Sequence, residues 1–500
     1  MINMLPVSIC RSLKSAALAA LIAVCPLTPV WADDLDTQLR LNQSIERQNR
    51  ESERALLADE DYLPGKRPQL VIDGKRYSVG KNANDLGRAI YLSLQHKQWS
   101  TVLAFLQEYE TLPNADPLLL AYARGALARI RGAMEESEQQ YRRLLELNPG
   151  FLPARLELAR VLFENHKDAE AETLFKQIEL SLDPLDRRQD GVRSTVGHFR
   201  AALAQRRAWN GSIAFGPTWN DNLNQSSESR TCLLSYAGQC FYERRIPDAV
   251  SSTGLDYEAT LNKQMPLSGH HGVYFRSLLY GQSYEETPDY DESTLTAEFG
   301  YRYQDLDDQI RLAPSFEFSR YANDSLYGAW GLHAEWMRHL SPTQFFKLEG
   351  EYQYLDYRSE RYRHYNGPSY SANATYWHQL PDNWVLFAGV DWLYRQASES
   401  IYAYRQPGLR VGASKQFDAG IDATLLVSRR QREYASYSPI LGEKRSDTEQ
   451  NYTLILKAPR LELAGFYPSL NLTHRSNDSN VDWLYNYDQN RVSLKLEKRF

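Results

Sequence analysis

The chain has 500 residues, a formal net charge of −6 and a pI near 6.0. This length is sufficient for two or more domains, and the lack of an overall basic field argues against a nucleic-acid partner. The mean hydropathy of −0.56 is too polar for a bundle of membrane-spanning helices. A membrane β-barrel is compatible with it, because only alternate residues of each strand meet lipid.

Residues 1–32 have the three parts of a signal peptide. Arg11 and Lys14 precede the apolar run AALAALIAVCPLTPV, and Ala32 supplies the small residue at the expected cleavage site. We predict cleavage after Ala32 and export to the periplasm. A single membrane anchor is the alternative, but the run is short and contains two prolines. Lipidation at Cys25 is a second alternative, which Val24 disfavours because such a site needs a small residue there.

Residues 33–85 are expected to form an N-terminal periplasmic extension. The segment from Asp34 to Glu60 reads as a charged amphipathic helix, which we interpret as an arm in the periplasm. The stretch QLVIDGKRYSV at 69–79 predicts a small hairpin, because Asp73-Gly74 between apolar and β-favouring residues is a strong turn signal.

A repeat appears in the next region, residues 86–205. Aligning 118–151 with 152–185 superposes small residues on small residues and an aromatic residue on an aromatic residue: Gly125 on Ala159, Ser137 on Ala171, and Tyr141 on Phe175. A looser copy precedes these two. Small residues at a helix crossing, an aromatic residue in the second helix and a closing proline are typical of tetratricopeptide (TPR) repeats. We therefore predict TPR-like helices, with antiparallel helices that lack a repeat register as the alternative.

Stacked repeats form a concave groove lined by the first helix of each pair, and such a groove suits an extended or helical peptide. In the two clear copies the groove positions are Tyr122, Arg129, Arg160 and Glu164. These four residues are our candidate client-binding site. The alternative is a solvated helix face without a ligand.

From residue 206 to residue 500 we predict a transmembrane antiparallel β-barrel of about fourteen strands, because the hydrophobic period changes to two. In QFFKLEGEYQYLDYR (344–358), for example, apolar and aromatic residues alternate with charged or polar ones. The predicted strands are 209–219, 253–265, 272–284, 293–305, 310–322, 328–341, 344–358, 370–380, 384–397, 406–418, 422–435, 446–458, 467–477 and 488–500.

The connections between these strands alternate between short turns and longer polar loops, as in outer-membrane barrels. A soluble sandwich is the alternative, but it does not combine strands of a dozen residues with this asymmetry. The chain ends in Phe500, preceded by apolar residues at alternate positions. This ending resembles the signal by which barrels are recognised for assembly, although Lys498 interrupts the alternation.

We find no motif for a nucleophile, a phosphate loop or a zinc protease, and we expect neither enzymatic activity nor a cofactor. The segment HAEWMRH places His333, Glu335 and His339 on one face of a predicted strand. We interpret this face as the polar lumen and not as a metal site. Cys232 and Cys240 are the only cysteines left after signal removal, and in an oxidising compartment we expect them to form a disulfide in the long loop after the first strand.

With these features the chain resembles the surface lipoprotein assembly modulators, or Slam proteins. The resemblance covers the extension, the TPR-like copies, about fourteen strands, the terminal Phe and, most specifically, the junction WNGSIAFGPTWNDNLNQ at 209–225. It implies a non-enzymatic outer-membrane translocator of a Gram-negative bacterium, with the TPR region in the periplasm. The implied partners are surface lipoproteins or haemophore-like clients, the outer-membrane bilayer and the barrel-assembly machinery.

Two other functions are compatible with a helical region joined to a barrel. A polysaccharide exporter would have a longer repeat array and a lumen of one charge sign, whereas the predicted lumen face mixes Lys347 and Lys495 with Glu298, Glu349 and Glu351. A nutrient porin would leave the helical domain unexplained. For a translocator, threading of an unfolded client and lateral opening of the barrel seam both remain open.

Overall fold

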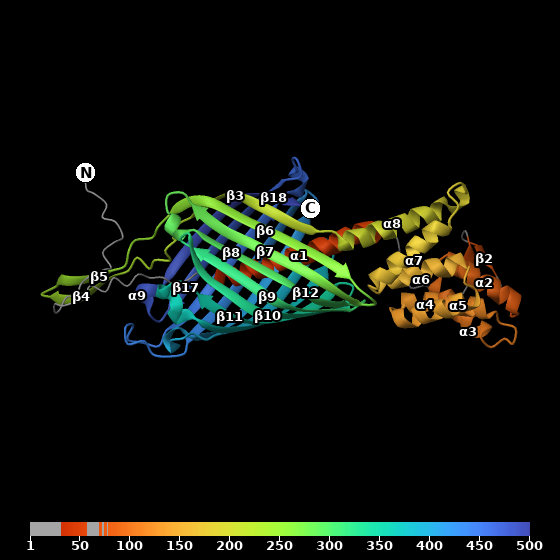
Figure 1. The fold of residues 1–500 in the computed structure, drawn as a ribbon, viewed down its shortest axis with the longest axis horizontal. Helices are drawn as coiled ribbons and strands as arrows, with labels where there is room; N and C mark the ends of the chain where they lie inside the picture. The colour runs from red at the N-terminus through yellow and green to blue at the C-terminus, as the bar shows by residue number, and fades with distance from the viewer. Residues whose placement is uncertain (1–31, 58–69, 73–74, 78) are drawn as a thin grey trace.

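Three parts follow one another along the long axis of the molecule: a helical domain, a β-barrel and a projecting hairpin (Figure 1). The computed structural model describes the backbone of residues 32–57, 70–72, 75–77 and 79–500. The predicted signal peptide falls almost wholly in 1–31 and the predicted turn in 73–74, both outside the described residues. The strands that flank this turn, β1 (Leu70–Ile72) and β2 (Lys75–Tyr77), pair antiparallel as predicted.

The helical domain consists of three helix pairs and one further helix. The pairs are α2 (Ala83–Gln95) with α3 (Trp99–Tyr109), α4 (Pro117–Ile130) with α5 (Met134–Leu147), and α6 (Leu152–Glu164) with α7 (Asp168–Ser181); α8 (Asp190–Arg207) completes the stack. Polar side chains begin two of these helices: Asn82 accepts a hydrogen bond from the Asp85 amide, and Asp116 accepts one from the Leu118 amide, each at 2.9 Å. Among the described residues, no helix is both long enough and apolar enough to span a membrane.

The pair formed by α4 and α5 shows why the repeat needs small residues. A Cβ atom at Gly125 would lie 2.9 Å from the Tyr141 ring, and the Ser137 hydroxyl donates a 2.7 Å hydrogen bond to the Gly125 carbonyl. Ala159 and Phe175, which the alignment makes equivalent to Gly125 and Tyr141, are also buried. The aromatic side chain of the second helix therefore fills the space that the small residue leaves, and the TPR-like fold is confirmed.

The barrel closes with fourteen antiparallel strands, as the sequence predicts. Its strands are β3 (Asn210–Asn220), β6 (Ser252–Pro266), β7 (His271–Tyr284), β8 (Glu292–Gln304), β9 (Asp308–Tyr321), β10 (Asp324–Ser341), β11 (Gln344–Tyr357), β12 (Gly367–Leu380), β13 (Trp384–Arg395), β14 (Tyr404–Phe417), β15 (Ile421–Tyr434), β16 (Ser446–Lys457), β17 (Tyr467–Ser479) and β18 (Tyr487–Arg499). Each pairs with its neighbours in sequence order, except that β6 follows β3 across the long loop that holds β4 (Arg230–Tyr236) and β5 (Gln239–Arg245).

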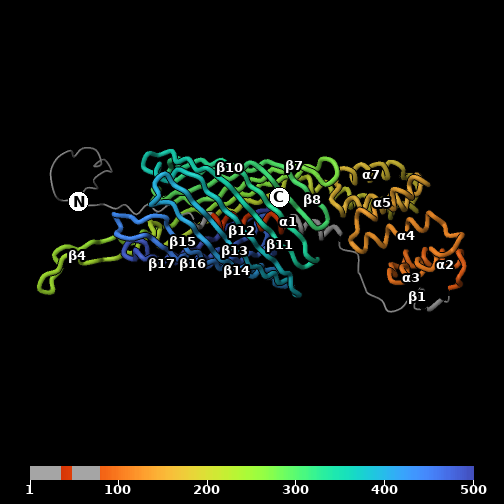
Figure 2. The backbone as a smooth tube through the Cα atoms, turned by 90° about the horizontal axis from the view of Figure 1, so that it is seen from below, coloured from red at the N-terminus to blue at the C-terminus, as the bar shows by residue number. Residues whose placement is uncertain are grey.

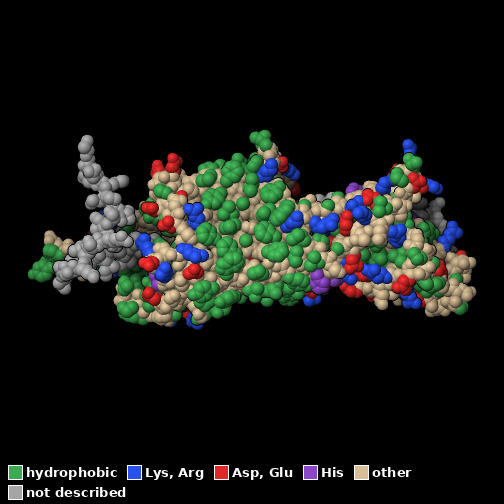
Figure 3. Space-filling model, viewed as in Figure 1, with side chains coloured by type: hydrophobic (Ala, Val, Ile, Leu, Met, Phe, Trp, Pro, Cys, Tyr) green, Lys and Arg blue, Asp and Glu red, His purple; other side chains and the backbone are tan. Residues whose placement is uncertain are grey.

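Side chains alternate between the two faces of the barrel wall, because successive residues of a strand point in opposite directions. On β14, Leu409 and Val411 are exposed at 62 % and 54 %, whereas Arg410 between them is buried. On β11, Lys347 faces inward and Leu348 faces outward. On the face seen in Figure 3 the outward side chains form a broad hydrophobic band across the barrel, which is the surface that a transmembrane barrel presents to lipid.

The seam between β3 and β18 closes the barrel, and its ladder is incomplete. The register runs from Arg491 opposite Asn220 to Arg499 opposite Ser212, with an interruption at Gly216 and Pro217. Proline has no amide hydrogen to donate, which accounts for part of this gap. At the end of the seam next to the helical domain, Gly211 and Phe500 exchange backbone hydrogen bonds of 3.0 and 3.1 Å.

Candidate functional site

The predicted groove residues lie on the first helices of two repeats, and three of them form one ion-pair cluster. Glu164 on α6 accepts a 2.8 Å hydrogen bond from the Nη1 of Arg129 on α4 and a 2.9 Å hydrogen bond from the Nε of Arg160. Glu157 lies 3.8 Å from the Arg129 guanidinium. Arg129 is buried, whereas Arg160 and Glu164 are half-buried. The cluster therefore links neighbouring repeats and leaves part of its charge on the surface.

Tyr122, the fourth predicted residue, lies on α4 and packs edge-to-face against Tyr141 and Phe151, with ring centroids 5.8 and 6.0 Å apart. Burial raises the pKa of the Tyr122 hydroxyl, and the nearby Glu157 carboxylate and Tyr91 add to the effect. The hydroxyl is therefore neutral at physiological pH. Tyr91 on α2 is 51 % exposed, so it adds an accessible aromatic side chain to the same face of the repeats.

The helical domain is docked on one mouth of the barrel (Figures 1 and 2). Only Ala208 and Trp209 separate α8 from β3. Leu306, in the short turn between β8 and β9, packs against the hydrophobic core of the repeats, and His166 lies 3.1 Å from the Gln304 amide nitrogen. These contacts hold the repeats beside the barrel opening. Because the short turns of the barrel lie at this mouth, it is the periplasmic one.

Charged residues of both signs line the lumen and pair across strands. Arg410 and Arg430 share the carboxylate of Asp391, at 2.9 and 3.3 Å. Arg276 and Arg311 both contact Glu335, at 3.4 and 2.8 Å. Buried charges require such partners, because an isolated ion in a low-dielectric interior is costly.

The segment around His333 belongs to this luminal network. Ligand atoms of His333, Glu335 and Glu349 lie within 4.8 Å of one another. The nearby cations, however, compensate the carboxylates: Lys347 Nζ lies 2.9 Å from Glu349 and 4.0 Å from Glu335. His339 is not part of this group, because its ring nitrogen lies 3.3 Å from the Asp307 carbonyl oxygen at the periplasmic turn. We therefore describe the cluster as an ion-pair network.

The lumen also holds a helix, α1 (Ala32–Leu57), which runs inside the barrel and leaves by the periplasmic mouth (Figure 1). Its side chains are described for residues 35–47. Asp36 accepts a 3.0 Å hydrogen bond from Arg430 on β15, and Glu46 lies 3.3 Å from Lys347 on β11. The interpretation of this segment as a periplasmic arm is therefore wrong for the described side chains. The helix carries side chains of both charge signs. Charged side chains of the lumen pair with them in place of water.

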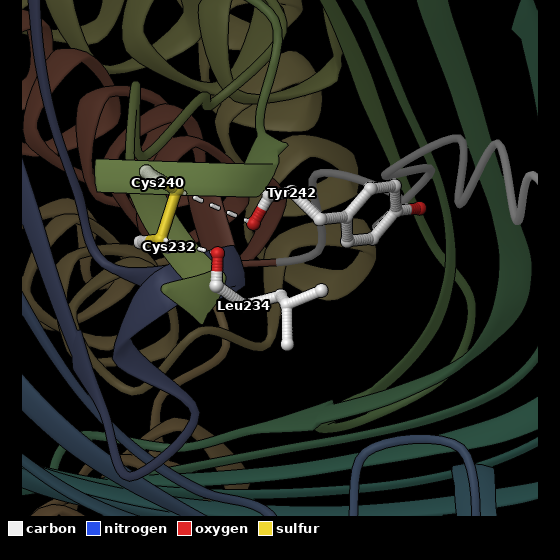
Figure 4. The surroundings of a disulfide bond; sticks show 4 residues. All are labelled: Cys232, Leu234, Cys240 and Tyr242. Carbon is white, nitrogen blue, oxygen red and sulfur yellow. Dashed lines mark hydrogen bonds between the residues drawn. A yellow bond between two sulfur atoms is a disulfide. The ribbon is translucent and has the colours of Figure 1, made fainter. Parts of the chain in front are cut away.

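At the opposite end of the barrel, the β4–β5 hairpin projects beyond the rim (Figure 1). A disulfide joins Cys232 to Cys240 across the hairpin, as expected from the cysteine count (Figure 4). The two sulfur atoms also lie 3.3 and 3.5 Å from the carbonyl oxygens of Leu234 and Tyr242. A two-stranded sheet is marginally stable alone, and the disulfide holds this one together.

Sequence reasoning missed the luminal position of α1 and the residues that hold it. Asp36, Arg40 and Glu46 lie on a helix of mixed charge, a pattern typical of a solvated surface helix. The one available signal was on the strands, whose inward faces carry many charges of both signs. Such charges need compensating partners inside the barrel, but their pattern does not say which segment supplies them.

A closed barrel with a hydrophobic outer belt, a charged lumen and helical repeats at one mouth defines the class of this protein. It is an outer-membrane β-barrel protein with a TPR-like domain in the periplasm. Residues 209–500 match the family described as surface lipoprotein assembly modifier, and residues 73–175 match the N-terminal TPR repeats of that family.

Known proteins are similar to a large part of the chain. A hemophilin secretion modulator from Acinetobacter baumannii is 41 % identical over 492 residues, which cover 95 % of this chain and 97 % of that protein. Surface lipoprotein assembly modifier 2 from Haemophilus influenzae is 25 % identical and covers 83 % of this chain and 84 % of its own. The crystal structure of Pseudomonas aeruginosa OpdK with vanillate is 7 % identical and covers 58 % of this chain and 99 % of its own, with a TM-score of 0.31. The chain belongs to the surface lipoprotein assembly modifier family.

Proposed function

We propose that this protein moves client proteins from the periplasm to the cell surface, and that the repeats bind the client while the barrel forms the exit path. The clients are surface lipoproteins or a secreted protein of the hemophilin kind, as the names of the relatives suggest. The role is transport and involves no enzymatic step. A polysaccharide exporter would have a lumen of one charge sign, whereas here Arg410 pairs with Asp391 and Lys347 pairs with Glu349.

The docking of the repeats on the periplasmic mouth is the main observation that supports this proposal. A polypeptide held on the first helices of the repeats is already beside the opening, because α8 continues almost directly into β3 and Leu306 packs into the repeat core. Raising the local concentration of a client at the entrance favours its entry without any further contact.

The groove residues offer two kinds of client contact. Tyr91 and Tyr122 provide aromatic surface, and Arg160 and Glu164 provide charge on the adjoining helix. Mixed aromatic and charged surfaces of this kind are typical of peptide-binding sites. We therefore propose that Tyr122, Arg129, Arg160 and Glu164 form the client-binding groove, with Arg129 orienting Glu164 from its buried position.

Deletion of the gene in its native host, followed by protease shaving of intact cells, tests the proposal. We expect one or a few specific proteins to lose surface exposure while they remain in the cell. The full chain restores their exposure, whereas the barrel from Trp209 onward does not. An unchanged surface proteome would contradict the proposal and would favour export of a polysaccharide, which a measurement of secreted sugar polymers would test.

A matched pair of variants tests the groove. Arg160→Ala is expected to weaken cross-linking of the repeats to the client, whereas Arg188→Ala, which removes the same charge from an exposed turn outside the groove, is not. Equal cross-linking by both variants would assign the client contact to another surface.

A further inference from the structure

The helix α1 is held in the lumen by contacts on several sides of the barrel. Gln38 donates to Glu317 on β9 at 3.3 Å, and Arg40 donates to Glu258 on β6 at 3.2 Å. Arg47 donates to Ser414 on β14 at 3.1 Å. Together with the contacts of Asp36 to β15 and of Glu46 to β11, these bonds place α1 across the lumen.

A cavity lies in the lumen beside the helix. A cavity of about 270 Å³ lies along the N-terminal half of α1, between Asp36 and Arg40 on the helix and Tyr327 and Tyr362 toward the outer mouth. The side chains of α1 contact strands on several sides of the barrel, β6, β9, β11, β14 and β15. The helix therefore occupies the path that a polypeptide would take through the lumen.

The contacts that hold α1 are mostly polar. Leu41 and Ile45 pack against Leu278 and Tyr280 in the one apolar cluster that joins the described side chains of α1 to the wall. The other contacts of these side chains are ion pairs and hydrogen bonds, and the polar groups of α1 that leave them bond to water instead. A helix held in this way is exchangeable, in contrast to one buried in a hydrophobic core.

The wall also carries a second counter-charge for each of the four residues that form ion pairs with α1. Arg430 keeps Asp391 at 3.3 Å, and Glu258 keeps Lys495 at 2.7 Å. Lys347 keeps Glu349 at 2.9 Å, and Arg311, which lies 3.8 Å from Glu46, keeps Glu335 at 2.8 Å. Removing one partner of a buried ion pair is costly when the other charge is left uncompensated. Each of these four wall residues therefore keeps one counter-charge when α1 leaves, which lowers that penalty.

We propose that α1 is a displaceable plug that closes the barrel at rest and leaves the lumen toward the periplasm when a client passes. The direction follows from its course, because α1 continues out of the periplasmic mouth (Figure 1). The requirement for displacement during transport rests on the function proposed above. The closure of the resting barrel does not depend on that function, and a separate experiment tests it.

Single-channel conductance of the purified full-length protein in planar lipid bilayers tests the closure without any client. We expect the native chain to conduct weakly, and the double variant Asp36→Asn/Glu46→Gln to open more often because it weakens the contacts to Arg430 and Lys347. Deletion of residues 35–47 is expected to give a persistently open channel. Asp418→Asn, which removes a charge from an exposed periplasmic turn, serves as the control and is expected to conduct like the native chain.

Native-like conductance in both the double variant and the deletion would overturn the proposal, provided that both variants show the heat-modifiable gel mobility of a folded barrel. A widely open native channel would overturn it as well. Raised conductance together with an unchanged surface proteome in the gene deletion would support the plug and reject the translocator function, so that the two failures are distinguishable.

A reversible tether tests displacement during transport. Cysteines at Asp36 and Ser428, whose side chains are 2.9 Å apart, are joined by a short thiol-cleavable cross-linker. We expect loss of client exposure on intact cells when the tether is closed and its recovery after cleavage. The single variants, treated in the same way, control for reduction of the native disulfide. Delivery by the tethered chain would overturn the requirement that α1 leaves.

Discussion

Gly125 lies where α4 crosses α5, and the free space at this crossing is smaller than a methyl group. Alanine is the better helix former, but its Cβ would lie 2.9 Å from the Tyr141 ring. We expect Gly125→Ala to lower the free energy of unfolding of the helical domain by about 1–3 kcal/mol, because overpacking a crossing displaces the aromatic ring. Urea denaturation, monitored by circular dichroism, measures this change in the free energy of unfolding.

Gly197 in α8 is the matched control, because a Cβ there has no neighbour within 4 Å. Gly197→Ala is expected to stabilise the domain by about 0.5–1 kcal/mol through the lower entropy of the unfolded chain. If both alanines stabilise the domain, the crossing is looser than the contact with Tyr141 implies.

His166 lies between the repeats and the barrel, where burial, and then the positive charges of Arg206 and Arg302, hold its pKa well below the ordinary 6.5. The ring is therefore neutral in the docked state. Below pH 6.5 an undocked ring gains a proton that the docked ring refuses, so docking weakens as pH falls, by at most about 1.4 kcal/mol per pH unit.

Cross-linking between the repeats and the barrel, measured from pH 8 to pH 5, checks this expectation. His166→Asn is expected to flatten the pH profile, and asparagine also tolerates the positive φ of 55° at this position. His198→Asn on the exposed side of α8 is the control. A native profile without slope would show that this histidine does not couple docking to pH.

Phe500, the last residue of the sequence, pairs with β3 at the β3–β18 seam and also carries an exposed side chain. Its backbone pairs with Gly211, and its ring is 50 % exposed. We propose that the ring is a signal for the barrel-assembly machinery and that the backbone pair closes the seam. Deletion of Phe500 is then expected to reduce assembled barrel in cells and also to slow refolding into detergent, because two backbone hydrogen bonds are lost, each worth about 1 kcal/mol.

Phe500→Ala separates the two roles, because it keeps the backbone pair and removes the ring. We expect this variant to refold normally in detergent and to assemble poorly in cells, as measured by heat-modifiable mobility. Normal assembly of the alanine variant in cells would show that the ring is not read as a signal.

Helix α8 fixes the position of the repeats relative to the barrel. Arg206 donates to Asp168 at 2.5 Å and lies over the Phe163 ring at 3.8 Å, so that α8 is fixed to the last repeat and not to the barrel alone. A flexible Gly-Ser linker of about six residues between Arg207 and Asn210 keeps both domains and removes this fixed spacing.

We expect the linker variant to retain client binding to the repeats and a folded barrel but to lose most surface delivery, because the bound client is no longer held at the entrance. Protease shaving and client cross-linking measure the two effects in the same cells. An insertion of equal length in the exposed turn at Asp418 is the control. Full delivery by the linker variant would show that tethering alone is sufficient.

The repeats and the strands of the barrel were predictable from the amino-acid sequence, because both depend on local periods. A strand directs alternate residues outward whatever surrounds it, and the small and aromatic positions of Gly125 and Tyr141 recur one repeat later at Ala159 and Phe175. The position of α1 is different, since Arg40 and Asp36 find their partners 218 and 394 residues away. Its mixed charges suit water and a charged lumen equally well. Only the closed barrel, by bringing Glu258 and Arg430 around one axis, decided that this helix lies inside.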